Sequence, residues 1–302
     1  MTDLPPPTDD APRTPTAEAP VRPLAGFGPM FGWGLRLTCR WGRLLLLGIP
    51  AIVGSALLAE TYVGGDNDRA KDDWLDLFAL LDEGVLGYIL PLITLLTVAS
   101  GLRVEIGRKT MVYHLVRPVS RTTMYLARFA SGVLPATVLG TLALAAICVG
   151  SGVDLPARIW LSLPVTAFIT ALTVGAFYYL VTTLFRGGMI IALIYTFVFE
   201  PMFAGTRGAM QKLSIMFHVR GVHHGMTDKV FAENSEAVRR SLDPEFDFRN
   251  LDIRSVDFFQ QLQERLAYDP LWTALTTCLL TAAGLLLLGM WRIRGRDFPL
   301  KD

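Results

Sequence analysis

The sequence predicts an all-α polytopic membrane protein with six transmembrane helices and both termini in the cytoplasm. The first observation is composition, because 52% of the 302 residues are hydrophobic and only 18% are charged, whereas about 25% of a soluble domain is charged. The second is that the apolar residues gather into six long runs, and the third is that the connecting segments differ in charge. A formal net charge of +1 gives no overall field that would attract nucleic acid.

The chain begins with a polar tail. Residues 1–24 are rich in proline, threonine, aspartate and alanine, cannot bury a core and are expected to be disordered. The remaining residues, 25–302, are expected to form a single transmembrane domain. Residues 27–41 mix aromatic side chains with Arg36 and Arg40, which predicts an interfacial helix before the first span.

The six apolar runs are each near the ~20 residues needed to cross a hydrocarbon core of ~30 Å. They lack period-two alternation, so helices are predicted rather than barrel strands. The predicted spans cover about residues 44–63, 84–102, 127–150, 159–185, 187–204 and 271–293. The interiors of the third, fourth and sixth spans contain no ionisable side chain, which argues against ion-driven transport. It favours a mechanism in which the energy for movement of the spans is supplied mechanically from outside the bilayer.

Basic residues on the connecting segments predict the orientation. The loop after span one has seven acidic and two basic residues. The segments before span one, after spans two and four, and after span six are basic. The positive-inside rule therefore places these four segments and both termini in the cytoplasm. Residues 205–269 are nearly charge balanced and are predicted to form an external insert of short helices packed over the spans.

Residues 101–128, between spans two and three, form the most informative segment. It carries six basic residues against one acid, Glu105. The mixture of basic and apolar residues predicts a helix that lies along the cytoplasmic interface and contacts a cytosolic partner. The alternative is a positive-inside anchor that contacts only lipid phosphates.

No motif for catalysis or cofactor binding accompanies the spans. The GRKT sequence at 107–110 lacks the glycine spacing of a Walker A loop, so no catalytic residue and no cofactor is expected in this chain. His218, His223 and His224 cluster after span five. They are weak candidates for a metal site, because no HExxH helix or cysteine pair accompanies them, and solvated or capping histidines are the alternative.

Two segments resemble the ABC-2 type transporter permeases. The first is residues 105–121, EIGRKTMVYHLVRPVSR, which is similar to the family motif between spans two and three. It matches at Glu105, Thr110, Leu115, Arg117, Pro118, Val119, Ser120 and Arg121. Lys109 stands where the family usually has glycine. The second segment, residues 192–221, is similar to the family's fifth span and the turn after it, with matches at Glu200 and at Leu213, Ser214 and Ile215.

The resemblance implies the permease subunit of an ATP-binding cassette transporter, expected to be an exporter in a bacterial inner membrane. Such permeases pair as homodimers or heterodimers and bind separate ABC ATPase subunits, which hydrolyse the ATP. The implied coupling helix contains Glu105, Thr110, Leu115, Arg117, Pro118 and Arg121. The resemblance also places Glu200 at the outer mouth, near the dimer axis, and a carboxylate that snorkels to the interface is the alternative.

Two other functions stay open at this point. One is a membrane assembly or scaffold protein that does not transport, in which the external insert binds a partner. The other is a metal-handling membrane component that uses His218, His223 and His224.

Overall fold

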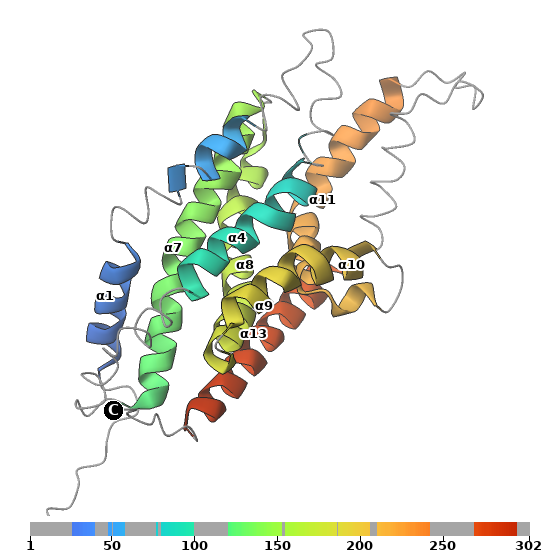
Figure 1. Cartoon of the computed structure of the whole chain (residues 1–302). Coiled ribbons are helices and arrows are strands. Elements are labelled where there is room, and N and C mark those ends of the chain that lie inside the picture. Colours follow the sequence, from blue (N-terminus) through green and yellow to red (C-terminus); the bar gives the residue numbers. More distant parts are fainter. Residues whose placement is uncertain are drawn as a thin grey trace, which may run out of the picture.

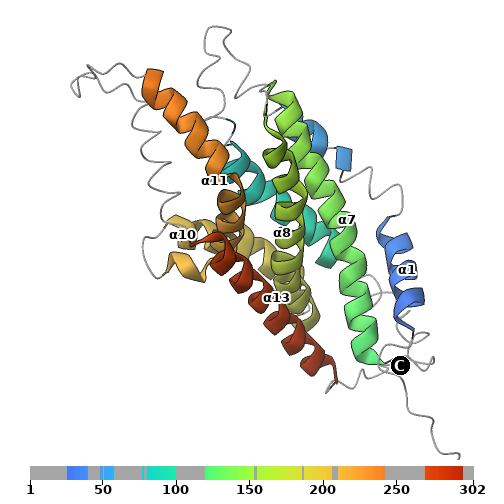
Figure 2. The same cartoon turned by 180° about the vertical axis from the view of Figure 1, so that it is seen from behind.

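The computed structural model describes residues 26–39, 48–49, 51–57, 77, 80–99, 120–152, 155–185, 187–205, 210–241 and 269–294. Every regular element in this described part is helical, in agreement with the predicted all-α class. The helices form one elongated bundle, with α1 lying along its side (Figures 1 and 2).

Two long helices, α7 (Arg121–Gly150) and α8 (Ala157–Leu184), form the centre of the bundle. α7 begins at a capped turn, because the Ser120 hydroxyl accepts a hydrogen bond from the Thr123 N–H at 3.1 Å. Both helices are apolar along their length and contain one internal proline each, which membrane helices tolerate. α8 packs against α7, α13, α11, α9 and α4, so it joins most elements of the bundle.

Predicted span two is one helical run of changing winding. It consists of the π-helix η1 (Leu80–Ile89), α4 (Leu90–Thr94) and the π-helix η2 (Leu95–Ala99). Pro91 is the second residue of α4 and lies inside this run, where it lacks the N–H of a helix interior, and membrane helices tolerate such a proline. Leu86, Leu90 and Val98 are almost fully buried, and α4 and η2 pack on α7 and α8.

The fifth predicted span is also interrupted by π winding. It consists of α9 (Gly188–Ile194), η3 (Tyr195–Phe199) and α10 (Glu200–Gly205). Its buried positions recur at every fourth residue, namely Gly188, Ala192, Thr196 and Glu200. A single narrow stripe of this helix therefore faces the bundle, and most of its other side chains are on the surface.

Two helices flank the bundle. α1 (Phe27–Thr38) begins at the residue predicted for the interfacial helix, ends a few residues earlier than predicted and packs against α7. α13 (Leu271–Arg294) packs against α8 and α11 on one side. Its other side exposes large apolar residues, among them Leu280 and Trp291.

α11 (Ile215–Ser241) belongs to the part of the chain predicted to form the external insert. Its first part packs between α8 and α13. The buried side chains there are Met216, Phe217, Val219, Val222, His223, His224 and Thr227. They recur at three- and four-residue intervals, as on the buried face of a helix. Residues 215–228 are therefore packed against two helices of the bundle, and the external location of the insert stays a prediction.

Within the described part of the chain, four helical runs are long and apolar enough to cross a membrane, namely Leu80–Ala99, Arg121–Gly150, Ala157–Leu184 and Leu271–Arg294. The apolar helix Gly188–Phe203 is shorter. Of predicted span one, only residues 48–49 and 51–57 are described, and these are helical. Helices thus occur at the positions of spans two to six, whereas the count of six stays a prediction. The predicted tail, residues 1–24, lies outside the described residues.

The helix ends are sorted between the two ends of the bundle. The start of α7, the end of α8, the start of α9 and the end of α13 lie together at the lower end in Figure 1, and α1 lies near the same end. These are the ends that the loop charges assign to the cytoplasm. Which side of a membrane this end faces stays a prediction.

Candidate functional site

The candidate coupling residues belong to the chain between η2 and α7. Five of them lie outside the described residues, namely Glu105, Thr110, Leu115, Arg117 and Pro118. Arg121 is the first residue of α7, directly after the Ser120 cap, and is half-buried. The dipole of a helix opposes a cation at its N-terminus.

Arg128 corrects one sequence-based expectation. It belongs to the basic segment 101–128, yet it is buried in α7 with 4% of its surface exposed. Its guanidinium carbon lies 4.2 Å from the centre of the Trp33 ring on α1, which is a cation–π arrangement. A Cβ atom on Gly34 of α1 would lie 2.8 Å from Arg128 Nη1. Arg128 thus joins α1 to α7, and the third span does contain an ionisable side chain.

Glu200 is the first residue of α10 and is almost fully buried. Its Oε1 atom accepts a hydrogen bond from the Met216 N–H at 2.7 Å and another from the Ser214 hydroxyl. Ser214 Oγ in turn accepts from the Phe217 N–H at 3.0 Å. These N–H groups belong to the first turn of α11, where helix N–H groups lack partners within the helix and an anion is favoured.

The Glu200 carboxylate therefore caps α11 from the fifth predicted span. Both the outer-mouth position and the snorkelling alternative depend on where the bilayer and a second permease lie, so the assignment of Glu200 to the outer mouth stays a prediction.

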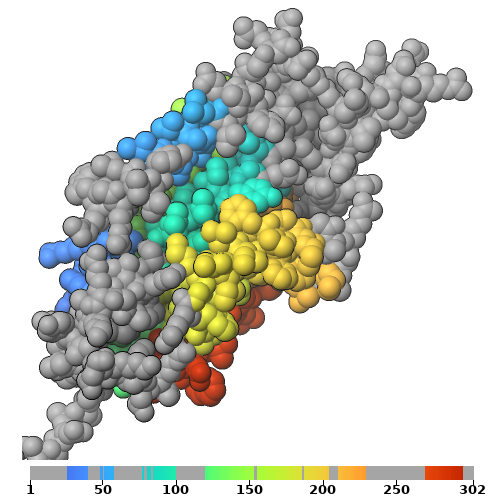
Figure 3. Space-filling view, viewed as in Figure 1, coloured from blue at the N-terminus to red at the C-terminus, as the bar shows by residue number. Residues whose placement is uncertain are grey.

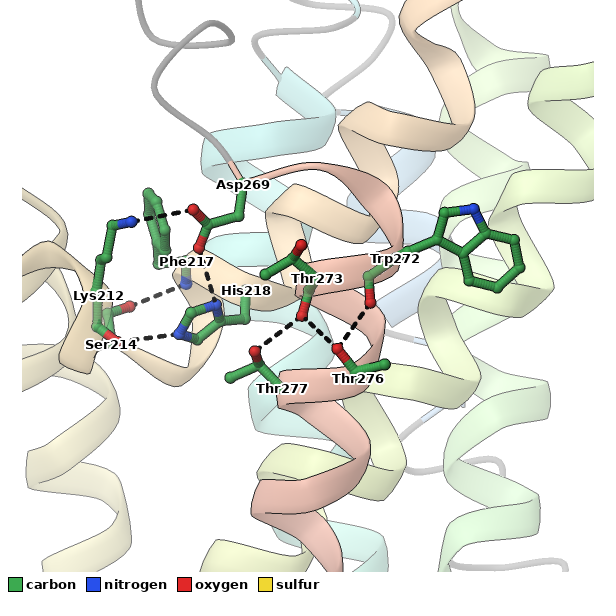
Figure 4. A network of polar contacts seen from close by, with 9 residues as sticks. All are labelled: Lys212, Ser214, Phe217, His218, Asp269, Trp272, Thr273, Thr276 and Thr277. Carbon is green, nitrogen blue, oxygen red and sulfur yellow. Dashed lines mark hydrogen bonds and ion pairs between the residues drawn. The ribbon is translucent and has the colours of Figure 1, made fainter.

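His218 belongs to a polar network at the two ends of the predicted insert (Figure 4). Its Nε2 atom lies 2.9 Å from the carbonyl oxygen of Lys212, and its Nδ1 atom lies 3.9 Å from Asp269 Oδ2. Asp269 also accepts a hydrogen bond from Lys212 Nζ at 3.0 Å. The network connects the start of α11 to the residues that precede α13.

The other two histidines of the cluster bond to two further elements. His223 Nδ1 lies 3.3 Å from Thr166 Oγ1 on α8. His224 Nε2 lies 2.7 Å from Asp82 Oδ2 on η1, and both of these side chains are largely buried. Sequence pattern did not single out Asp82 or Thr166. Asp82 stands at the end of the acidic loop after span one, so it resembles a solvated loop residue, and a threonine inside an apolar span gives no signal.

The metal-site hypothesis gains no support from this arrangement. Among the described residues, no three His, Cys, Asp or Glu side chains are arranged to hold a metal ion. His218, His223 and His224 instead bond to three different parts of the bundle.

The comparison with known families agrees with the resemblance seen in the sequence. The family model for the ABC-2 type transporter matches residues 41–218. This range includes predicted spans one to five, the segment 105–121, Glu200 and the first turn of α11. No curated protein and no solved structure matches the chain. Because the family model covers more than half of the 302 residues, this chain belongs to the ABC-2 type transporter family, whose membrane domain is the permease component of an ABC transporter.

Proposed function

We propose that the chain is the membrane-spanning subunit of an ATP-driven exporter in a bacterial inner membrane, and that a separate ATPase subunit supplies the energy. The observation that carries the proposal is the family match over residues 41–218. Family members generally work with a separate ATPase. The sequence agrees with this division of labour, because it has no Walker A loop of its own.

In this proposal, residues 105–121 form the contact with the ATPase. The Ser120 cap joins the end of the segment to the first turn of α7, so a displacement of the segment acts directly on α7. α7 packs on α8 and, through Arg128, on α1. Closely packed helices shift as units rather than deform continuously, so movement at the segment would reach the centre of the bundle. The basic character of the segment suits an acidic groove on the partner.

A second permease, identical or homologous, would cover the exposed face of the fifth predicted span. Its exposed apolar side chains are Ile190, Ile191, Leu193, Ile194, Phe197, Val198, Phe199 and Met202, and Figure 3 shows this segment in yellow on the surface. At 1.5 Å per residue, Gly188–Phe203 is about 24 Å long, less than the ~30 Å core. Oligomerisation is one way in which a short apolar helix relieves such a mismatch.

The test is purification of the complex from its native membrane, followed by measurement of ATP turnover. Glu105→Ala and Arg117→Ala should each lower turnover by roughly tenfold, the effect of losing a hydrogen bond to a charged group. Arg158→Ala is the matched control, because Arg158 is an exposed arginine at the start of α8, at the opposite end of the bundle. Its turnover should equal that of the wild type.

The outcomes separate the hypotheses. Unchanged turnover in both Glu105→Ala and Arg117→Ala would show that this segment does not couple the subunits. Stable insertion of the protein without any associated ATPase would favour the membrane assembly or scaffold function instead.

A further inference from the structure

The contact between His224 and Asp82 has an unusual position in the bundle. His224 lies on α11, and Asp82 lies near the start of η1, the first part of predicted span two. Their Nε2 and Oδ2 atoms are 2.7 Å apart, and the side chains are 4% and 21% exposed. Protein therefore shields this pair from water, which strengthens the electrostatic attraction between its members relative to a surface pair.

Three other polar contacts of α11 go to different elements. Glu200 on α10 caps its first turn, Thr166 on α8 lies beside His223, and Asp269 before α13 lies beside His218. α11 packs extensively on α8 and α13 and only over a small area on η1. In that small area, the His224–Asp82 pair is accompanied by Arg220, whose Nη2 atom would lie 3.1 Å from a Cβ on Gly87.

Span two is also the element that directly precedes the candidate coupling segment in the chain. Its helical run continues from Leu80 to Ala99, and residues 105–121 follow in the chain. Asp82 is thus at one end of this run and the coupling segment is at the other. A continuous helix with buried contacts transmits a displacement along its length, because a packed interface shifts between discrete arrangements.

We propose that Asp82 and His224 form a latch between α11 and span two, which opens when ATP-driven movement of the coupling segment displaces span two. The proposal rests on the proposed function. Opening separates a buried charged group from its partner, which is unfavourable unless both become hydrated. The Asp82–His224 pair is therefore either in contact or separated with both side chains hydrated. The contact of α11 with span two then depends on the position of span two.

The small contact area is what makes a latch possible. α11 stays attached to α8 and α13 through its apolar face when the pair separates, because Met216, Val219 and Val222 are buried and the main packing of α11 is on those two helices. Span two can then move relative to α11 without unfolding it. A purely structural pair, by contrast, would stay closed in every nucleotide state.

The first experiment tests the contact without any ATPase. Hydrogen–deuterium exchange is measured for the amides of residues 219–228 in the full chain reconstituted in lipid nanodiscs. Asp82→Asn and His224→Gln should each accelerate exchange by about tenfold, because each leaves a buried polar group with a weaker partner. Lys212→Gln removes the exposed Lys212–Asp269 pair and serves as the control, with a change of less than about twofold.

The second experiment tests the latch during turnover. In the purified complex, addition of ATP and Mg²⁺ should accelerate exchange of residues 219–228 by about threefold or more, as expected for a switching element of low local stability. In Asp82→Asn, exchange should already be fast and respond little to nucleotide. ATP turnover is measured on the same samples.

Each result has a definite meaning. Turnover without any nucleotide effect on residues 219–228 of the wild type would overturn the latch and leave the proposed function intact. Wild-type exchange rates in both Asp82→Asn and His224→Gln would also overturn it. Absence of any ATPase in the purified complex would instead overturn the proposed function, on which the latch depends.

Discussion

At the scale of single residues, close approaches and buried polar groups determine how the helices fit together. Gly289 on α13 lies directly against the phenol of Tyr125 on α7, a side chain with no exposed surface. Only the absence of a Cβ atom at position 289 allows this approach. Gly284 lies on the same helix, and a Cβ atom added there would meet no other atom within 4 Å, so its side faces open space.

The first prediction compares these two glycines. Gly289→Ala should lower the free energy of unfolding by about 1–3 kcal/mol, because its methyl group overlaps Tyr125 in a packed interior. Gly284→Ala should be neutral or stabilising by up to about 1 kcal/mol, because alanine favours a helix. Thermal unfolding in one detergent, followed by tryptophan fluorescence, measures both. Equal midpoints for the two variants would show that α7 and α13 do not meet at this position.

The second prediction concerns the Glu200 cap. Glu200→Ala leaves the Met216 N–H and the Ser214 hydroxyl without their acceptor, and should lower stability by about 1–3 kcal/mol. Glu200→Gln keeps an oxygen acceptor, so its loss of stability should be clearly smaller than that of Glu200→Ala. The matching local measurement is hydrogen exchange in the first turn of α11. If exchange there were the same in Glu200→Ala as in the wild type, Glu200 would not be its cap.

At the scale of elements, α1 is attached to the bundle by an extensive contact with α7. Gly34 lies against Ser131 and Arg128, whereas Gly32 has open space around its Cβ position. The chain carries a natural probe of this attachment. Cys39, at the end of α1, is partly exposed, whereas Cys148 and Cys278 are buried.

The third prediction follows from the chemistry of that thiol. Burial raises the pKa of the Cys39 thiol above its ordinary value of 9.0, so less of the reactive thiolate is present at a given pH. Alkylation by iodoacetamide should therefore be slow near neutral pH and still accelerate as the pH rises through 9.0. Loosening α1 lowers the pKa toward its ordinary value and increases the thiolate fraction.

Gly34→Ala should accordingly accelerate alkylation of Cys39 by about threefold or more near pH 8, because exposure and thiolate fraction rise together. Gly32→Ala should react like the wild type. Mass spectrometry of the modified peptide gives both rates. A Gly34→Ala rate equal to that of Gly32→Ala would mean that α1 does not depend on its contact with α7.

The elements also show what the sequence could and could not predict. Long apolar runs predicted α7, α8 and α13 to within a few residues, except that α7 begins at Arg121 rather than near 127. Because α7 starts earlier than predicted, Arg128 lies two turns inside the helix and is buried. In the sequence, a basic residue at the predicted boundary of a span resembles a loop residue, so its burial was not expected. The first part of α11 was missed for a related reason, since its buried face contains His223 and His224, whose partners lie far away in the sequence.

For the candidate site, local motifs were informative and pairings were not. The motif around Glu200 identified an important residue, but its bonds to Ser214 and Met216 depend on how the chain folds back. Asp82 gave no local signal, because only the position of α11 makes it the partner of His224. Polar contacts between helices depend on how the helices pack, and a single sequence does not give the distances between side chains on different helices.

At the scale of the whole molecule, contact with a cytosolic ATPase requires that the end of the bundle at which α7 begins faces the cytoplasm. The fourth prediction tests this with single cysteines in a background without the three native ones. Arg158→Cys should react with a membrane-impermeant maleimide added outside intact spheroplasts. Arg117→Cys should react only after the cells are permeabilised, because the positive-inside rule places its segment in the cytoplasm. The reverse labelling pattern would show that the orientation in the membrane is opposite to the predicted one.

The family match shows that the chain is a permease component. If a separate ATPase drives it, a physical contact must transmit the movement of the ATPase to the helices. In the proposed function, residues 105–121, which follow span two in the chain and precede α7, would act on both elements at once. Ser120 and Arg121 are the described end of that connection. In the proposed function, the ATPase touches this segment and does not touch the described helices at the opposite end of the bundle.

The most direct measurement is site-specific photo-crosslinking in the native membrane. A photoreactive amino acid replaces Leu115 in one variant and Arg158 in another, and the products are identified by mass spectrometry. Position 115 should form an adduct with an ABC ATPase, with a yield that changes when ATP is added, and position 158 should form no such adduct. An ATPase adduct from position 158, or none from position 115 in a complex that still hydrolyses ATP, would contradict the proposed contact between the ATPase and residues 105–121.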